Sequence, residues 1–223
     1  MKLSGFRAAH LVQSILDADP GRKQAVADIR NLLVAICPRR KYAVVDHVLH
    51  RFVLYVMDLA ASEKNHHARP YGLIDHSLEV VKLSLEDAQA LGWPPSWVYG
   101  VFVAALLHDI GKTTDVAVRA PEGAVWNPFV EPLAAFYVRY RLAPGDLAQI
   151  HYRAGRGLDG HVRIAPYFYS AILPVEAREY LGQVLSALLL RQSPMLEDLV
   201  HRVDGVSASR DRARKPPSRG PVV

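Results

Sequence analysis

The sequence predicts a mostly α-helical fold with one small β-hairpin. Apolar residues recur every three or four positions through most of the chain, which is the spacing of one face of a helix. Clusters of proline and glycine fall between these periodic stretches, as at 19–21 and 92–95. The exception is residues 114–126, where valines flank the turn sequence Ala120-Pro121-Glu122-Gly123. That pattern is typical of a β-hairpin.

The expected helices follow one another with short connections. The first three are separated by Asp19-Pro20-Gly21 and Cys37-Pro38, and a fourth opens after Gly72. The fifth ends in an uninterrupted apolar run, which predicts that it is buried. Ser193-Pro194 is a start signal for the last helix. In chain order, we expect helices over residues 6–15, 25–36, 42–59, 73–91, 96–107, 133–140, 164–173, 177–190 and 195–203.

Length and composition indicate one domain of ordinary size with a well-filled core, because the chain has 223 residues and is 50% hydrophobic. The single cysteine excludes an internal disulfide and favours a reducing compartment. The longest uncharged apolar run, residues 97–107, is far shorter than the ~20 residues that span a bilayer. We therefore expect a cytoplasmic protein without a signal peptide or membrane span.

We divide the chain into three parts. Residues 1–50 are expected to form N-terminal helices that pack on the core, and residues 51–209 the domain itself. Residues 210–223 are expected to be a disordered basic tail, rich in arginine and proline. The formal net charge of +5 and the pI near 9.4 agree with a tail that neutralises phosphates. A solubilising tail without that role is the alternative.

The pair His108-Asp109 is the most informative feature, because it closes an apolar run that predicts a buried helix. Buried polar groups need partners, and imidazole nitrogen and carboxylate oxygen are both ligands of divalent metals. Adjacent residues of a helix point about 100° apart. Further ligands must therefore come from other helices. His76, near the start of the fourth helix, and Asp204, after the last, are the candidates. Each of the four alone would be better explained structurally, as a core histidine, a helix-capping aspartate or a turn aspartate.

Several stretches together resemble a known family. The order His76, His108-Asp109, Asp204 is that of the HD metal-dependent phosphohydrolase superfamily. Residues 60–80, with His66-His67 and His76, resemble the histidine-rich motif of TraI-type, MobH-class conjugative relaxases. So do residues 104–112 (AALLHDIGK), Trp126-Asn127-Pro128 and Pro132-Leu133. Tyr71 departs from the pattern, since such proteins usually have a second glycine there. These relaxases also usually continue beyond the point that corresponds to Val223.

The resemblance implies an HD-domain helical bundle with a divalent metal ion, one or two, at His76, His108, Asp109 and Asp204. The mixed nitrogen and oxygen ligands favour Mn²⁺, Fe²⁺, Ni²⁺ or Mg²⁺ over a closed zinc site. His161 is expected to be a further ligand, and His151 a weaker candidate. His66, His67, Asp109 and Lys112 are expected to be catalytic, with Lys112 holding a substrate phosphate. Lys112 as a solvated lysine at a helix end, and the two histidines as ordinary loop residues, are the alternatives.

The implied function is cleavage of a DNA phosphodiester at a conjugative transfer origin. The expected partners are single-stranded or locally melted DNA and other relaxosome proteins. Other relaxase classes use a tyrosine nucleophile, but none of the ten tyrosines here carries a distinguishing motif. Two alternatives remain open at this point. One is a phosphohydrolase of nucleotides or cyclic dinucleotides, with a small closed pocket. The other is a non-catalytic DNA-binding subunit of a transfer apparatus.

Overall fold

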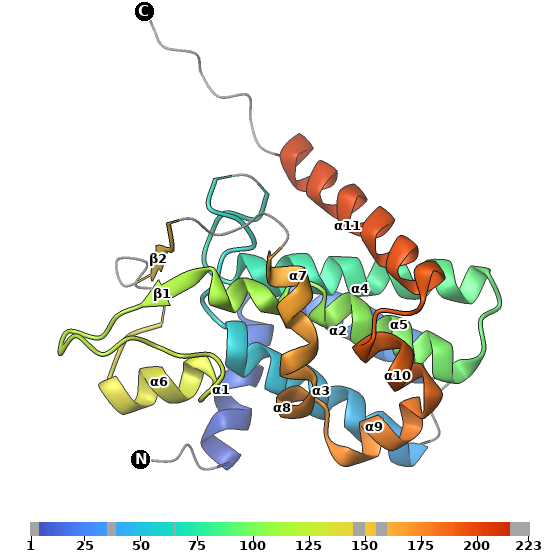
Figure 1. Ribbon diagram of the computed structural model, residues 1–223, viewed down its shortest axis with the longest axis horizontal. Coiled ribbons are helices and arrows are strands. Elements are labelled where there is room, and N and C mark those ends of the chain that lie inside the picture. Colours follow the sequence, from blue (N-terminus) through green and yellow to red (C-terminus); the bar gives the residue numbers. More distant parts are fainter. Residues whose placement is uncertain (1–4, 35–38, 65, 145–149, 155–159, 215–223) are drawn as a thin grey trace, which may run out of the picture.

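The computed structural model describes residues 5–34, 39–64, 66–144, 150–154 and 160–214. Helices dominate them, with two short strands, as the periodicity predicted (Figure 1). In chain order, the elements are α1 (Gly5–Asp17), α2 (Pro20–Val34), α3 (Arg39–Val56), α4 (Gly72–Ala90), α5 (Pro95–Leu107), the 3₁₀ helix η1 (Ile110–Thr114), β1 (Val116–Val118), α6 (Leu133–Tyr140), β2 (Ile150–Tyr152), α7 (Gly160–Ile164), the 3₁₀ helix η3 (Ala165–Phe168), α8 (Tyr169–Ile172), α9 (Val175–Leu181), α10 (Gln183–Leu189) and α11 (Pro194–Arg214).

The centre of the molecule is the pair α4 and α5, which pack along each other (Figure 1). Every residue of α5 from Val98 to Leu107 is buried, so this helix is apolar all round, as the sequence predicted. Helix α2 packs against α4, while α11 packs against both α4 and α5. This arrangement brings the start of α4, the end of α5 and the middle of α11 together. No helix in the described part of the chain has the length and apolar character needed to cross a membrane.

The predicted hairpin is present after η1. Strand β1 leads into a tight turn, Arg119 bridges to Val125, and the backbone N–H of Trp126 donates to the Val118 carbonyl at 2.9 Å. β1 also pairs in antiparallel fashion with β2, which places Ala117 opposite His151. This second pairing could not be predicted from the sequence, because the two strands are far apart in the chain.

Two predicted helices are interrupted. Residues 177–190 form α9 and α10 instead of one helix, because Gly182 takes a φ of +52° that a right-handed helix does not contain. Residues 164–173 are divided between the end of α7, η3 and α8. Pro166 stands at the start of η3, where it has no N–H to offer to a continuous α-helix.

The last helix is longer than predicted. α11 continues beyond residue 203 to Arg214, so Asp204 lies within a helix and not in a turn. Gly205 did not end it, since glycine lowers helix stability only by about 1 kcal/mol and packing on α4 and α5 offsets that. The first five residues of the expected tail, 210–214, are therefore helical. Residues 215–223 lie outside the described part.

The N-terminal helices share the hydrophobic core with the rest of the chain. Val12 of α1 and Phe52 of α3 are fully buried in it, and α3 runs without a break through residue 50, where we divided the chain. α2 begins five residues earlier than predicted. The Asp19 side chain caps it by accepting the backbone N–H of Arg22 at 2.9 Å, and Pro20 is its first residue. Cys37 lies outside the described residues.

Candidate metal centre

The end of α5 supplies two adjacent side chains that meet. His108 is still helical, but Asp109 has φ −104° and ψ 5°, after which η1 begins. This departure from the helix lets neighbours that would otherwise diverge approach each other. The Nε2 of His108 lies 3.4 Å from Oδ2 of Asp109. Asp109 is buried, with 6% of its surface exposed.

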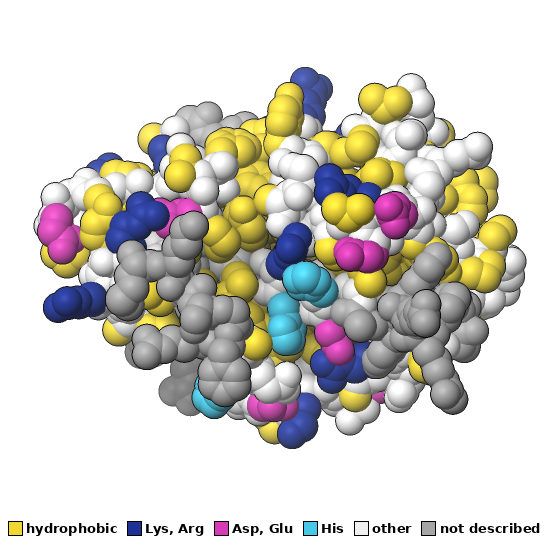
Figure 2. All heavy atoms as spheres, turned by 90° about the horizontal axis from the view of Figure 1, so that it is seen from below, with side chains coloured by type: hydrophobic (Ala, Val, Ile, Leu, Met, Phe, Trp, Pro, Cys, Tyr) yellow, Lys and Arg dark blue, Asp and Glu magenta, His cyan; other side chains and the backbone are white. Residues whose placement is uncertain are grey.

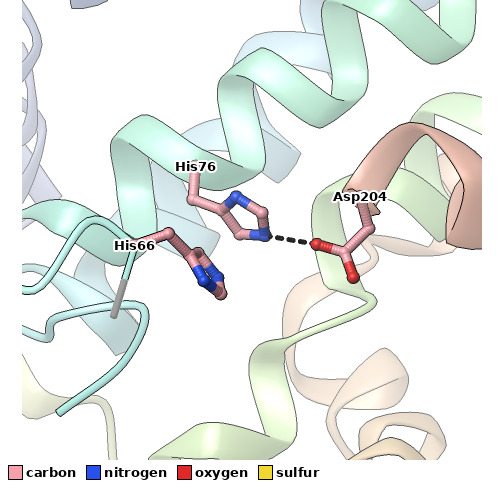
Figure 3. Close-up of side chains that lie close together, drawn as sticks. All are labelled: His66, His76 and Asp204. Atoms are coloured by element: carbon pink, nitrogen blue, oxygen red, sulfur yellow. Dashed lines mark ion pairs between the residues drawn. The ribbon is translucent and has the colours of Figure 1, made fainter. Parts of the chain in front are cut away.

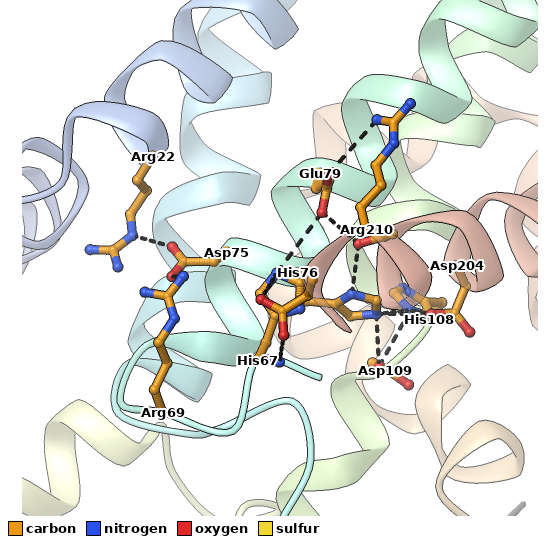
Figure 4. Close-up of polar contacts among 12 residues, drawn as sticks. Arg22, His67, Arg69, Asp75, His76, Glu79, His108, Asp109, Asp204 and Arg210 are labelled. Carbon is orange, nitrogen blue, oxygen red and sulfur yellow. Dashed lines mark hydrogen bonds and ion pairs between the residues drawn. The ribbon is translucent and has the colours of Figure 1, made fainter. Parts of the chain in front are cut away.

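Two other helices complete a cluster around this pair (Figure 4). His76, in α4, is fully buried, and its Nε2 lies 3.0 Å from Oδ1 of Asp204 in α11. The same nitrogen lies 3.5 Å from Oδ2 of Asp109 and 3.3 Å from Nε2 of His108. His108 and Asp204 are 3.9 Å apart by their nearest nitrogen and oxygen. Four ligand atoms from α4, α5 with its following turn, and α11 thus converge.

Hydrogen bonds on the far side of each imidazole fix its tautomer. Ser207 donates its hydroxyl proton to Glu79 at 2.7 Å, so its oxygen must accept from Nδ1–H of His76 at 3.1 Å. The Nδ1 of His108 lies 2.7 Å from the carbonyl of Ala105, which can only accept. Both Nε2 atoms therefore present lone pairs to the cluster. This is the arrangement of metal-ligating histidines, whose other nitrogen donates to a protein group.

The cluster attracts positive charge. Burial by itself would lower the pKa of His76, but hydrogen bonds and charges from Asp109 and Asp204 raise it above the usual value. Burial likewise opposes ionisation of Asp109, yet the charges of His108 and Lys112 hold its pKa well below the usual range. Two lone pairs and two carboxylates meet here, and a divalent cation would satisfy all four.

The spacing fits such a cation. Nitrogen and oxygen ligands lie about 2.0–2.2 Å from a first-row metal, which puts neighbouring ligand atoms about 3 Å apart around an octahedron. The measured separations of 3.0–3.9 Å around His76 and His108 are in this range. Ligand atoms of His76, His108 and Asp109 all lie within 4.8 Å of one another and can hold one ion, with Asp204 beside His76.

A second group of ligands overlaps the first. Nitrogens of His66 and His76 and an oxygen of Asp204 all lie within 4.8 Å of one another (Figure 3). Burial, and then the nearby His76 and Lys112, lower the pKa of His66 to about 4. The ring is therefore neutral near pH 7, and its Nε2 is buried without a hydrogen-bond partner among the described residues. A second ion beside the first would find a free ligand there.

His67 is placed differently from its neighbour. It is buried, with its backbone N–H donating to Asp211 of α11 at 2.8 Å. Its Nε2 lies 3.9 Å from both Asp211 and Glu79. His67 thus joins the loop between α3 and α4, which we call the histidine loop (residues 57–71), to the end of α11. These contacts support a positioning role for His67 more than contact with substrate.

Lys112 does not lie one helical turn beyond His108, because α5 ends before it. The 3₁₀ turn brings its ammonium group onto Oδ2 of Asp109, the oxygen that faces both histidines. Its side chain is 19% exposed. The lysine stands at the edge of the cluster, within reach of a phosphate that binds there.

The other candidates lie apart or outside the described residues. His151 is exposed on β2 and belongs to neither group of metal ligands. His161 lies in α7, and its side chain is outside the described part. Tyr71 has a left-handed backbone, with φ +62°, at the position where the resembled relaxases usually have glycine. Its ring lies 5.1 Å from the guanidinium carbon of Arg22, a contact that helps to hold this turn.

The residues that orient the cluster were missed in the sequence. Ser207 follows Asp204 by three positions, and Glu79 follows His76 by three, so each shares a helix face with the ligand it supports. The i, i+3 spacing was a usable signal, but serine and glutamate are too common on helices to be singled out by it.

Histidine side chains reach the surface near the centre of the face in Figure 2, next to acidic and basic side chains. Among the residues described in that view, Lys and Arg occur singly or in small groups, with hydrophobic side chains between them. Basic residues close to the cluster are already paired: Lys112 with Asp109, and Arg69 with Asp75 at 3.0 Å. On the described part of this face, positive charge that could bind a polyanion is therefore limited to small separate patches.

Comparison with protein families gives one match. The model of the TraI_2 family, described as "Putative helicase", matches residues 18–222. The match covers every residue of the cluster and the helices that carry them. Comparison with curated proteins finds no match.

Proposed function

The chain belongs to the TraI_2 family, and we propose that it is a metal-dependent phosphodiesterase of the HD type that nicks DNA in conjugative transfer. The MobH-like motifs of the sequence support this assignment within the family. The substrate would be single-stranded or locally melted DNA at a transfer origin, presented together with other relaxosome proteins.

The observation that carries the proposal is the convergence of two imidazole lone pairs and two carboxylates. His76 and His108 donate their Nδ1 protons to Ser207 and to the carbonyl of Ala105, so in the neutral rings Nε2 carries a lone pair. An arrangement built only for structure would be expected to pair such groups with donors. The cluster instead has the ligand set of a divalent metal site.

A divalent ion would supply Lewis acidity toward a phosphoryl oxygen and toward water. Residues of the chain would hold this ion and position the phosphate. His76, His108, Asp109 and Asp204 would hold the ion, and Lys112 would bind a non-bridging phosphate oxygen as a point charge. Hydrolysis joins a water oxygen to phosphorus and breaks the bond to one sugar oxygen, which leaves with a proton. No tyrosine is needed for this reaction.

The description of the family names a helicase, which requires a site for nucleoside triphosphate. The single Gly-Lys-Thr sequence, residues 111–113, would end a phosphate loop only if glycine stood at 106, where the chain has Leu106. Thr113 is buried and donates to the carbonyl of Ile110, while Lys112 pairs with Asp109. This turn is part of the metal cluster, so we assign it to phosphodiester cleavage.

A second candidate function is hydrolysis of nucleotides at the same cluster. It is favoured by a cavity of about 490 Å³ that His108, Asp109 and Asp204 line together with apolar residues. Cavities of this size suit small molecules. The two functions share their metal chemistry and differ in substrate.

Metal analysis and a nicking assay test the proposal. The protein should bind at least one Mn²⁺ per chain after removal and return of metal, as measured by elemental analysis. His108→Ala and Asp109→Ala should lose most of it, while His10→Ala, which replaces an exposed histidine of α1, should keep it. With Mn²⁺, supercoiled plasmid carrying the cognate transfer origin should become open circular.

Two outcomes would change the conclusion. A wild-type protein that takes up no divalent ion contradicts the metal site. Efficient hydrolysis of nucleotides or cyclic dinucleotides without any nicking would establish the second candidate in place of the first.

A further inference from the structure

The cavity beside the metal cluster is suited to bind part of a substrate. It is lined by residues of α5, η3, α8, α10 and α11, and it includes three of the four ligands. Its apolar lining comes from small and branched side chains, among them Ala104, Ala165, Leu188, Leu196 and Val200. Any molecule that binds the cluster from this side therefore places its adjoining group against an apolar surface.

Polar groups line the same cavity. Arg191 and Glu197 form an ion pair of 2.9 Å, which uses Oε2 of the glutamate. The other oxygen, Oε1, is buried without a hydrogen-bond partner among the described residues. This oxygen has almost no surface open to solvent, so a molecule in the cavity does not reach it. Tyr169 also lines it, and burial raises the pKa of its hydroxyl, which stays protonated.

We infer that this cavity holds the nucleoside next to the scissile phosphate, with its base taken out of the stack. The inference rests on the proposed function, because a DNA phosphodiester at the cluster carries a nucleoside on either side. The volume lies within the range of small-molecule pockets, and the apolar lining can cover the faces of a base. A paired base could not enter, so the substrate would be single-stranded or melted DNA.

The test uses deoxynucleoside 3′,5′-bisphosphates, which carry phosphate on both sides of the sugar, and calorimetry with the Mn²⁺-loaded protein. Ala187→Trp places a large ring in the cavity, while Leu190→Trp places the same ring on an exposed position three residues later. We expect Ala187→Trp to weaken binding at least tenfold and Leu190→Trp to leave it unchanged, both with wild-type metal content.

The outcomes separate this inference from the proposed function. If Ala187→Trp binds the bisphosphates and nicks DNA as well as the wild type does, the nucleoside site is overturned and the nickase proposal stands. Loss of bisphosphate binding in Ala187→Trp, with no nicking by the wild type, would support the site and overturn the nickase.

Discussion

At the scale of single residues, one hydroxyl proton decides how His76 faces the cluster. Ser207 gives its proton to Glu79 and therefore accepts from His76, which leaves the opposite ring nitrogen free for a cation. All three side chains lie between α4 and α11, and His76 and Ser207 are fully buried. Such supporting partners typically alter metal affinity 10–100-fold, far more than an exposed hydrogen bond would.

Replacing Ser207 should therefore weaken metal binding without removing a ligand. In Ser207→Ala, the Nδ1–H of His76 loses its acceptor and the ring is free to turn. We expect the Kd for Mn²⁺, measured by competition with a chelator, to rise about 10–100-fold. Ser209→Ala is the control, because Ser209 lies on the same helix but is exposed and bonds only within α11. An unchanged Kd in Ser207→Ala would show that orientation of His76 does not limit binding.

At the scale of elements, the histidine loop is held against the start of α4. The carbonyl of His67 accepts backbone N–H groups of Ala61 at 3.2 Å and Arg69 at 2.9 Å. A Cβ atom on Gly72 would lie 1.9 Å from that same carbonyl oxygen. Only glycine permits this approach, so Gly72 links the position of the loop to that of His76, four residues later on α4.

Two glycine substitutions should therefore have opposite effects on the free energy of unfolding in urea. Gly72→Ala forces the histidine loop away and should destabilise the protein by at least about 1–3 kcal/mol. Gly205→Ala lies inside α11 with open space around its Cβ, and should stabilise by roughly 0.5–1 kcal/mol through helix propensity. A Gly72→Ala protein as stable as the wild type would mean that the loop is not fixed by this contact.

At the scale of the whole molecule, α11 holds the metal cluster and the histidine loop together. It carries Asp204 and Ser207 toward α4, and its last turns reach His67 through Asp211. Arg210 lies 3.8 Å from Glu79. The residues that begin the expected basic tail are therefore part of the structure around the site, and their removal does more than remove charge.

Two truncations should separate these roles. Ending the chain at Arg214 removes Lys215 and Arg219 and keeps all four proposed ligands and the described residues around them, so metal content should stay at the wild-type level. The slope of log DNA affinity against log salt concentration should become less negative, by at most about 0.7–0.9 for each lost phosphate contact.

Ending the chain at Ser209 also removes Asp211, which accepts from the backbone of His67. This shorter protein should show a looser histidine loop, measured as faster amide hydrogen exchange over residues 57–71, and weaker Mn²⁺ binding. Equal exchange in the two proteins would contradict the role of Asp211.

The sequence by itself determined the elements whose cause is local. Helical periodicity and proline and glycine punctuation predicted the helices, and the apolar run predicted the burial of α5. Valines around a turn sequence predicted the hairpin, and residue type and order picked out His76, His108-Asp109 and Asp204 as candidates. The ends of helices were less certain, because a conformation such as that of Gly182 is not visible in composition.

Only the tertiary structure decided how these candidates meet. The hydrogen bond between His76 and Ser207 joins residues 131 positions apart, and that between Glu79 and Ser207 joins residues 128 apart. Such pairs depend on the packing of α11 against α4, which buries apolar surface on both helices and is not encoded in either helix alone. The same holds for β2 on β1 and for the cavity beside the cluster. A sequence names the groups that can do chemistry, but their distances are set by how helices pack over the whole chain.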